Sequence, residues 1–327
     1  MKKHLIPEAG KFYKANLHCH TNVSDGALSP EETKKMYMEK GYSVIAFTDH
    51  DFFHTHNNLT DENFLALNGY EMAIHDTKEM DICPSHSDKP RFGYIKCCHF
   101  NMIASKNTIT KQPVSPSPSF DYGVESIKNM MKKGKDAGFF IVYNHPTWNS
   151  ESYPEYMGYD YMDALEIINY DCIVSGYDER NPRVYDDMLK GMKKIGCIAT
   201  DDNHNPPKGF FGGYTMIKSD SLDYDSIIDA LYNKHYYCSE SGPEIKALYI
   251  EDNRVHIEFE NARECFVTTA FRQWIEDRRV EDMNCNLTHH SFEMNPNDVY
   301  FRFTVVGKDG KCSYTNAYFY EDILKEL

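Results

Sequence analysis

Two histidines near the start of the chain, His18 and His20, stand two residues apart. They follow Leu17 in a short extended run, and because side chains of a strand alternate between its faces, both imidazoles leave on the same side. Neutral imidazoles placed in this way can bind one metal ion. A carboxylate, Asp25, follows in the turn before a predicted helix. Such a pair is more often an exposed pair or a core pair, so it does not establish a metal site alone.

Residues of the same kind recur along the chain, mostly at or just past the ends of predicted strands. These further candidates are His50, Glu71, His99, His145, Asp202 and His204. Each has a structural alternative: Asp25 could only turn its loop, and His145, before Pro146, could only end a strand. The packing of a hydrophobic core does not require histidine at so many strand ends. Their joint placement therefore predicts a metal site.

Short β-branched or aromatic runs alternate with helical stretches from about residue 12 to 242. The predicted strands are Tyr42–Phe47, Tyr70–Met72, Tyr94–Cys98, Gly138–Asn144, Asp163–Ile168 and Gly196–Thr200. The predicted helices are Pro30–Lys40, with Ser29 as N-cap and Glu32 closing a capping box, Val124–Ala137, and Pro182–Lys194, capped by Asn181. Strands separated by helices indicate a parallel sheet, and an α/β barrel keeps its chemistry at the carboxyl ends of such strands. The proline-rich residues 106–120 are expected to form an exposed loop near the mouth of the site.

The pattern changes after Gly242-Pro243. Alternation of apolar and polar residues predicts strands at Val255–Phe259, Glu264–Thr269 and Val299–Val306, and Lys308–Lys311 reads as a hairpin turn before a strand at Ser313–Tyr320. We therefore predict two domains, a barrel over residues 1–243 and a small antiparallel, β-sandwich-like module over residues 244–327.

Composition limits the classes of function. The chain has 327 residues and a formal net charge of −15, which argues against a broad nucleic-acid footprint. The ten cysteines are scattered and form no Cys-x-x-Cys pair, which favours reduced, mostly buried thiols. No apolar run is long enough to span a membrane, and no apolar segment follows the basic first residues. These features predict a cytoplasmic protein, and they leave its oligomeric state open.

The ordered motifs resemble those of the PHP (polymerase and histidinol phosphatase) family. They are Leu17-His18-Cys19-His20 with Ser24-Asp25-Gly26, Thr48-Asp49-His50-Asp51, Gly69-Tyr70-Glu71, His99, Asn144-His145-Pro146 and Asp202-Asn203-His204. The resemblance covers about residues 12–242. It implies a distorted (β/α)7 TIM-like barrel with a trinuclear metal centre, and mostly phosphoesterase activity. The C-terminal β module is similar to that of the branch that includes carbaryl hydrolases, a weaker match.

The resemblance also implies a ligand set for each metal ion. His18, His20, Glu71 and Asp202 would hold the first ion and would activate the attacking hydroxide. Glu71 would bridge to a second ion, completed by His99 and His145. Asp25, His50 and His204 would hold the third.

Imidazole and carboxylate ligands suit Zn, Mn or Fe, so we expect two or three divalent ions of these elements. Close metal ions lower the pKa of a shared water and clamp the attacking and leaving oxygens of a displacement. The expected reaction is hydrolysis of a small phosphorylated metabolite or nucleotide. A carbamate, ester or amide hydrolase with the same cluster is the first alternative, and a non-catalytic metal-containing binding module is the second.

Assignments beyond the ligands are less specific. His54 is the candidate general acid, with His56 and His75 as other possibilities, although such histidines are more often loop residues. Arg180 and Lys208 are candidate phosphate-binding residues, with Arg183 as a third, and Trp148 could stack on a ring. Asp49, Asp51 and Asp201 could orient imidazoles.

Overall fold

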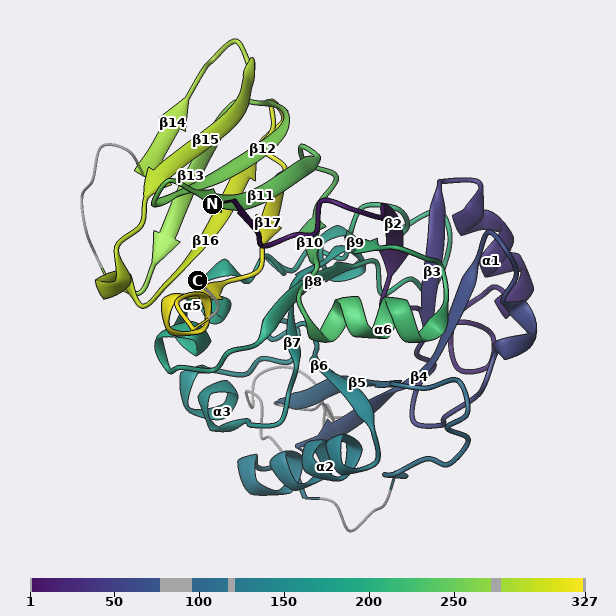
Figure 1. The fold of residues 1–327 in the computed structure, drawn as a ribbon. Helices are drawn as coiled ribbons and strands as arrows, with labels where there is room; N and C mark the ends of the chain where they lie inside the picture. Colours follow the sequence, from purple (N-terminus) through teal and green to yellow (C-terminus); the bar gives the residue numbers. More distant parts are fainter. Residues whose placement is uncertain (1, 77–95, 117–120, 272–277, 326–327) are drawn as a thin grey trace, which may run out of the picture.

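The computed structural model describes residues 2–76, 96–116, 121–271 and 278–325, and these form a mixed α/β fold with two sheets (Figure 1). Within the described residues, no helix is both long and apolar enough to cross a membrane. The larger sheet carries the predicted site residues. Its strands in the first part of the chain are β2 (Lys11–Asn16), β3 (Tyr42–Phe47), β4 (Leu65–His75), β5 (Cys97–Ala104), β6 (Phe139–Tyr143), β7 (Ala164–Asn169), β8 (Gly196–Thr200), β9 (Tyr214–Ser219) and β10 (Tyr236–Ser239).

Helices lie against these strands, with α1 on β3, α2 on β6, α5 on β7 and α6 on β9. Their bounds are α1 (Pro30–Met38), α2 (Val124–Asp136), α3 (Tyr153–Gly158), α4 (Tyr170–Val174), α5 (Pro182–Lys190) and α6 (Tyr224–Tyr232), with a short 3-10 turn η1 (Asn57–Leu59). The strands β6, β7 and β8 are buried along their whole length, as expected for parallel strands covered on both faces.

The helix start predicted before the first long helix is confirmed. Ser29 accepts a hydrogen bond from the Glu32 amide at 3.2 Å, and the Glu32 carboxylate accepts one from the Ser29 amide at 2.9 Å. This capping box with Pro30 in the first turn fixes where α1 begins, and hence where the loop that carries Asp25 ends.

One strand runs against the predicted direction. β2, β3 and β4 are parallel, and so are β6, β7 and β8, but β5 is antiparallel to both β4 and β6. The expectation that His99 follows the carboxyl end of a strand is therefore wrong: it lies near the amino end of β5, which the reversed direction brings to the same edge. The first residues of the strand predicted at Tyr94–Cys98 lie outside the described residues.

The predicted barrel is not confirmed, because no closed sheet is found among the described residues. The strand order of the large sheet has two ends, at β14 and at β8. Beyond the strands, however, the chain segments that follow β2 and β8 meet: the Asp202 amide donates to the His18 carbonyl at 3.0 Å, and the His20 amide donates to the Asn203 carbonyl at 3.3 Å. These backbone bonds join the two segments that carry five of the predicted ligands, His18, His20, Asp25, Asp202 and His204.

The C-terminal part of the chain is antiparallel, as predicted. A four-stranded sheet contains β1 (Lys3–His4), β11 (Ile245–Glu251), β12 (Arg254–Ala262) and β15 (Leu287–Glu293). The large sheet continues through β10 into β17 (Cys312–Thr315), β16 (Tyr300–Val306), β13 (Glu264–Thr269) and β14 (Arg279–Glu281), with β18 (Tyr318–Phe319) beside β16. A 3-10 turn η3 (Pro296–Asp298) and a short helix α7 (Tyr320–Ile323) complete the described elements.

The predicted hairpin turn is confirmed, since Gly307 and Lys311 are hydrogen-bonded at 2.9 Å between the antiparallel strands β16 and β17. Side chains from both sheets form one apolar core in this region. The division at residue 243 stays a prediction, because β1 pairs with β11 and β17 pairs with β10 across it. Figure 1 shows the N-terminus beside this C-terminal region.

Candidate metal centre

The nine predicted ligands come from six neighbouring segments of the large sheet. His18 and His20 follow β2, Asp25 lies in the loop before α1, and His50 follows β3. Glu71 lies within β4 and His99 within β5. The remaining three, His145, Asp202 and His204, follow β6 and β8. All nine side chains meet at one edge of the sheet.

Glu71 is the centre of the cluster. Its carboxylate is 1% exposed and faces five imidazoles. The nitrogen–oxygen distances are 3.4 Å to His18, 3.4 Å to His20, 3.1 Å to His50, 3.2 Å to His99 and 3.2 Å to His145. Each oxygen faces its own set of imidazoles. Oε1 faces His18, His99 and His145, and Oε2 faces His20 and His50. A carboxylate with imidazoles on both oxygens is arranged to bridge two cations.

Asp202 forms a second point of convergence. Its Oδ1 lies 3.1 Å from His18 Nε2 and 3.0 Å from His20 Nε2, and its Oδ2 lies 3.7 Å from His145 Nε2. Asp202 has a φ of 54°, a left-handed conformation that aspartate adopts more readily than most residues.

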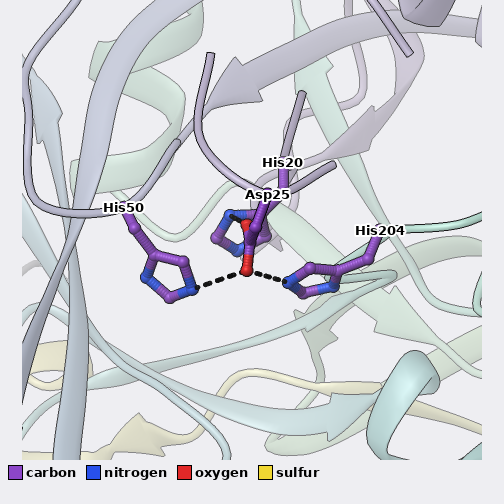
Figure 2. A group of neighbouring side chains, drawn as sticks. All are labelled: His20, Asp25, His50 and His204. Carbon is purple, nitrogen blue, oxygen red and sulfur yellow. Dashed lines mark ion pairs between the residues drawn. The ribbon is translucent and has the colours of Figure 1, made fainter. Parts of the chain in front are cut away.

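A third group lies nearer to solvent (Figure 2). The Asp25 carboxylate, 53% exposed, sits between two imidazole rings, 3.6 Å from His50 Nε2 and 3.6 Å from His204 Nε2. His20 Nδ1 is 3.5 Å away. Figure 2 shows the side chains of His20, His50 and His204 converging on Asp25 from separate segments.

The donor set fits divalent cations. Asp202 Oδ1 is buried beside two imidazole nitrogens, yet it accepts no hydrogen bond, and His50 Nδ1, His99 Nε2 and His145 Nδ1 are also buried without one. The Nε2 atoms of His18 and His20 face each other at 3.0 Å. Nitrogen and oxygen atoms with lone pairs that lie this close together, several of them without a hydrogen-bond partner, form an arrangement that a cation would stabilise.

Electrostatics agree with this reading. Burial lowers the pKa of His20, but the carboxylates of Asp202 and Glu71 outweigh it and raise that pKa to about 10. Burial also lowers the pKa of His145, but Glu71 outweighs this effect and raises that pKa to about 9. Burial raises the pKa of Glu71, but the surrounding imidazoles hold it well below its usual value. The centre therefore keeps its carboxylates ionised and attracts positive charge.

Sequence reasoning missed the residue that orients His18. The Glu166 carboxylate, fully buried on β7, lies 2.7 Å from His18 Nδ1 through Oε1, and Thr200 Oγ1 donates to the same oxygen at 2.6 Å. Its Oε2 accepts from the His145 amide and from Asn169 Nδ2, both at 3.0 Å. A hydrogen bond from Nδ1 to Glu166 would leave the lone pair of His18 Nε2 for a bound cation. The available signal was one glutamate inside the apolar run Ala164–Ile168.

The aspartates expected to orient imidazoles instead contact loops and the cavity. Asp49 accepts from the Thr21 amide at 2.8 Å and from Ser24 Oγ at 2.8 Å, which fixes the loop that carries Asp25. Asp201 accepts from the amides of Phe211, Gly212 and Gly213. Asp51 lines the cavity. Among the described residues, none of these three carboxylates contacts an imidazole in the way that Glu166 contacts His18.

A cavity of about 630 Å³ opens over the cluster. Besides the candidate ligands and Asp51, its walls include two other residues that the sequence singled out, His75 and Trp148. They also include several that it did not, namely Ala73, Asp171, Cys172, Ser175 and Asn205. Asp171 Oδ2 lies 3.6 Å from His204 Nδ1. The Trp148 ring meets those of His99 and His145 edge to face, each at 5.0 Å between centroids. The predicted loop near the mouth reaches the site through Gln112, which donates to the Asp51 carbonyl at 2.7 Å; residues 117–120 of that loop lie outside the described residues.

Five residues proposed for proton transfer or phosphate binding lie away from this cavity. Arg180 forms a two-point ion pair with Glu240, whose carboxylate neutralises the guanidinium. His54 and Lys208 are exposed and do not line the cavity. His56 is buried with its ring 4.7 Å from that of Phe47. Arg183 pairs with Asp187 on its own helix.

Comparison with known proteins gives one family match and several structural likenesses. Residues 16–172 match the model of the PHP domain. No curated protein matches the sequence. A two-domain protein from Bacteroides vulgatus, described as containing a predicted PHP-like metal-dependent phosphoesterase, is 17% identical, with 97% of this chain and 98% of that chain covered and a TM-score of 0.49.

Two further solved structures are similar over part of the chain. A candidate metal-dependent phosphoesterase from Bifidobacterium adolescentis is 14% identical, covers 62% of this chain and 90% of its own, and has a TM-score of 0.39. An amidohydrolase from Chromobacterium violaceum, with bound sulfate and no metal, is also 14% identical, covers 59% and 88%, and also has a TM-score of 0.39.

The carbaryl-hydrolase branch is not confirmed by these matches. The matching family model is the one that the ordered motifs predicted: residues 16–172 of this chain match the PHP domain.

Proposed function

We propose that this chain is a metal-dependent phosphoesterase that acts on a small phosphorylated molecule with two or three divalent cations, Zn, Mn or Fe. The observation that supports the proposal is the convergence of six imidazoles and three carboxylates from six segments. Seven of the nine side chains line one cavity, and His18 and His20 are buried beside them. Packing does not explain such a cluster, because buried polar groups without partners destabilise a fold.

The side chains fall into overlapping groups, each with ligand atoms within 4.8 Å of one another. These groups are His18, His20 and Glu71; His18, His145 and Asp202; His50, Glu71 and His99; and His20, Asp25, His50 and His204. They support a first cation held by His18, His20, Glu71 and Asp202, a second by Glu71, His99 and His145, and a third by Asp25, His50 and His204. The overlaps at Glu71 and His20 are the reason to expect the cations close together.

Bound divalent cations supply an activated water and neutralise the charge of a phosphoryl group. The chain's own residues hold this arrangement in place. Glu166 fixes the proton of His18, and Asn144 Nδ2 donates to Glu71 Oε1 at 2.8 Å, which orients the carboxylate. Trp148 and His75 form a wall on which the rest of the substrate can lie.

The charge of the cavity bears on the substrate. Its described lining includes Asp51 and Asp171 in addition to the proposed ligands, and it includes no lysine or arginine. These carboxylates repel a phosphate monoester, which carries two negative charges, more strongly than a phosphate diester, which carries one. The same observation favours, as a second candidate, hydrolysis of an uncharged carboxyl ester, carbamate or amide. We propose no role for His54, Arg180 or Lys208 in either reaction.

The test compares hydrolysis of p-nitrophenyl phosphate, bis(p-nitrophenyl) phosphate and p-nitrophenyl acetate by the protein loaded with Mn²⁺ or Zn²⁺. Elemental analysis of the same samples gives the metal content. We expect turnover of a phosphate substrate, fastest for the diester, that chelators abolish and added metal restores. A His256→Ala variant, altered in the C-terminal β region, is the matched control and should be as active as the parent. Turnover of the carboxyl ester alone would replace the first candidate by the second.

A further inference from the structure

His75 and Cys97 lie next to the metal centre but outside the ligand set proposed above. They belong to the antiparallel pair β4 and β5, in which His75 stands opposite Cys97 and Ala73 stands opposite His99. Because side chains alternate along a strand, residues 71, 73 and 75 share one face with residues 97, 99 and 101. This is the face that carries Glu71. The row of candidate ligands therefore continues along the ladder past His99.

The three side chains of His75, Cys97 and His99 are close enough to hold one ion. Their ligand atoms all lie within 4.8 Å of one another, and the rings of His75 and His99 are 5.5 Å apart and nearly perpendicular. Cys97 and His99 are 6% and 4% exposed, and His75 lines the cavity. A cation could enter from the cavity past His75.

His99 belongs to both groups, His50–Glu71–His99 and His75–Cys97–His99. Its Nδ1 lies 3.2 Å from Glu71 Oε1, and its Nε2 is buried with no hydrogen-bond partner. A neutral imidazole carries one proton and one free lone pair, so it binds a cation through only one nitrogen at a time. Occupation of the second group therefore competes with the role of His99 beside Glu71.

We propose that His75, Cys97 and His99 form a separate site for a thiophilic divalent cation such as Zn²⁺, Co²⁺ or Cd²⁺, and that its occupation withdraws His99 from the catalytic centre. The inhibitory part rests on the proposed function, whereas the binding part does not. A thiolate with two imidazoles selects these ions over Mg²⁺, Ca²⁺ and Mn²⁺, and a water can take the fourth position. On binding, the Cys97 thiol gives its proton to solvent and loses its present contact with Asn149 Oδ1 at 3.4 Å.

The direct test is spectroscopic. The protein is first loaded with Mn²⁺, which prefers oxygen and nitrogen ligands, and is then titrated with Cd²⁺ while the ultraviolet thiolate-to-metal charge-transfer absorption is followed. We expect an absorption that saturates with the parent protein and is lost in Cys97→Ser. Cys312→Ser, which removes a half-buried thiol of the C-terminal β region, is the matched control and should keep it. A Cys97→Ser protein with the same saturating absorption as the parent would overturn the proposal.

A second variant guards against a folding defect in the first. His75→Asn keeps the thiol, and we expect it to need about tenfold more Cd²⁺ for half-saturation, within the range of losses seen when metal-site residues change. Circular dichroism of each variant verifies the fold. Unchanged half-saturation in a folded His75→Asn protein would contradict the assignment of His75 as a ligand.

The activity arm separates this proposal from the proposed function. Excess Zn²⁺ should inhibit the Mn²⁺-loaded parent and should inhibit Cys97→Ser at least tenfold less effectively. If no substrate is turned over under any condition while the absorption is lost in Cys97→Ser, the proposed function fails and the cation site stands. If turnover is found and Zn²⁺ inhibits both proteins equally, the inhibitory role fails.

Discussion

At the scale of single residues, the account depends on Glu71, whose two oxygens face imidazoles from the segments after β2, β3 and β6 and from β5. An amide has only one oxygen to offer and no charge, so Glu71→Gln cannot bridge two cations. We expect less bound metal and a loss of turnover of at least about 100-fold, the upper end of the effect of changing residues around a metal site. Elemental analysis, initial rates and circular dichroism check this. Full activity in a correctly folded variant would remove the bridging role.

Glu166 gives a second prediction at this scale, as a positioning residue. Both of its oxygens accept hydrogen bonds, so the amide of Glu166→Gln sets an N–H against existing donors, either His18 and Thr200 or the His145 amide and Asn169. We expect metal affinity to fall about 10–100-fold while the fold persists. Competition with a chelating dye measures the affinity. Glu240→Gln, which removes a buried carboxylate outside the cluster, should leave it unchanged.

The nine candidate ligands could be found from the sequence because their residue types are uncommon at strand ends and their motifs occur in order. Glu166 could not be ranked in the same way, because a single buried glutamate does not reveal its partner. Arg180 was a candidate for phosphate only by its position near the last strands, and the sequence could not show that Glu240, sixty residues later, already neutralises it.

At the scale of elements, strand positions were predictable and one strand direction was not. Tyr42–Phe47 and Gly196–Thr200 are strands with the predicted bounds, since apolar runs between turn signals are a local feature. The direction of β5 shows only in its antiparallel pairing with β4 and β6, which no local sequence pattern reveals. The α5 helix stops at Lys190 rather than at the predicted Lys194, with Gly191 as its C-cap.

Glu151 joins three segments of the chain through hydrogen bonds, and its titration gives a pH prediction. Its carboxylate accepts from Tyr122 at 2.7 Å and from Tyr143 and Tyr159, and burial raises its pKa to about 7 in spite of these donors. In the unfolded chain a glutamate titrates at about 4.3, so the folded state binds the extra proton between these values. Stability from this group is therefore present below pH 4 and is lost as pH rises to 7.

Glu151→Gln should remove that part of the pH dependence. We expect the free energy of unfolding of the parent, relative to the variant, to fall by about 2–3 kcal/mol between pH 4.5 and pH 8. Urea denaturation of both proteins at several pH values measures the difference, in which the effects of other groups cancel. A difference that is constant across this range would mean that the carboxylate is ionised throughout.

At the scale of the whole molecule, the C-terminal β region braces the sheet that carries the site. Asn316 Oδ1 accepts from the Cys197 amide at 2.9 Å, at the start of β8, and the end of β8 leads to Asp202. Arg302 of β16, 2% exposed, forms a two-point ion pair with Asp186 of α5 at 2.7 and 2.9 Å. The prediction of two domains did not foresee this contact, because no local pattern pairs a strand arginine with a helix aspartate 116 residues away.

Substitution of Asp186 tests whether its ion pair with Arg302 stabilises the fold. Asp186→Ala leaves Arg302 buried without its carboxylate, and we expect a loss of about 3–5 kcal/mol in the free energy of unfolding. Arg279→Ala, which breaks the exposed pair with Glu264, is the control and should cost less than about 1 kcal/mol. Equal effects of the two substitutions in urea denaturation would show that the Arg302 pair contributes no more than a surface contact.

The central claim is that side chains from six segments of the chain hold several cations together. The most direct measurement is anomalous diffraction from crystals soaked in Mn²⁺. The account predicts two or three peaks within coordination distance of Glu71, Asp202 and Asp25. Peaks at other places only, or a single peak that contacts none of these carboxylates, would contradict it.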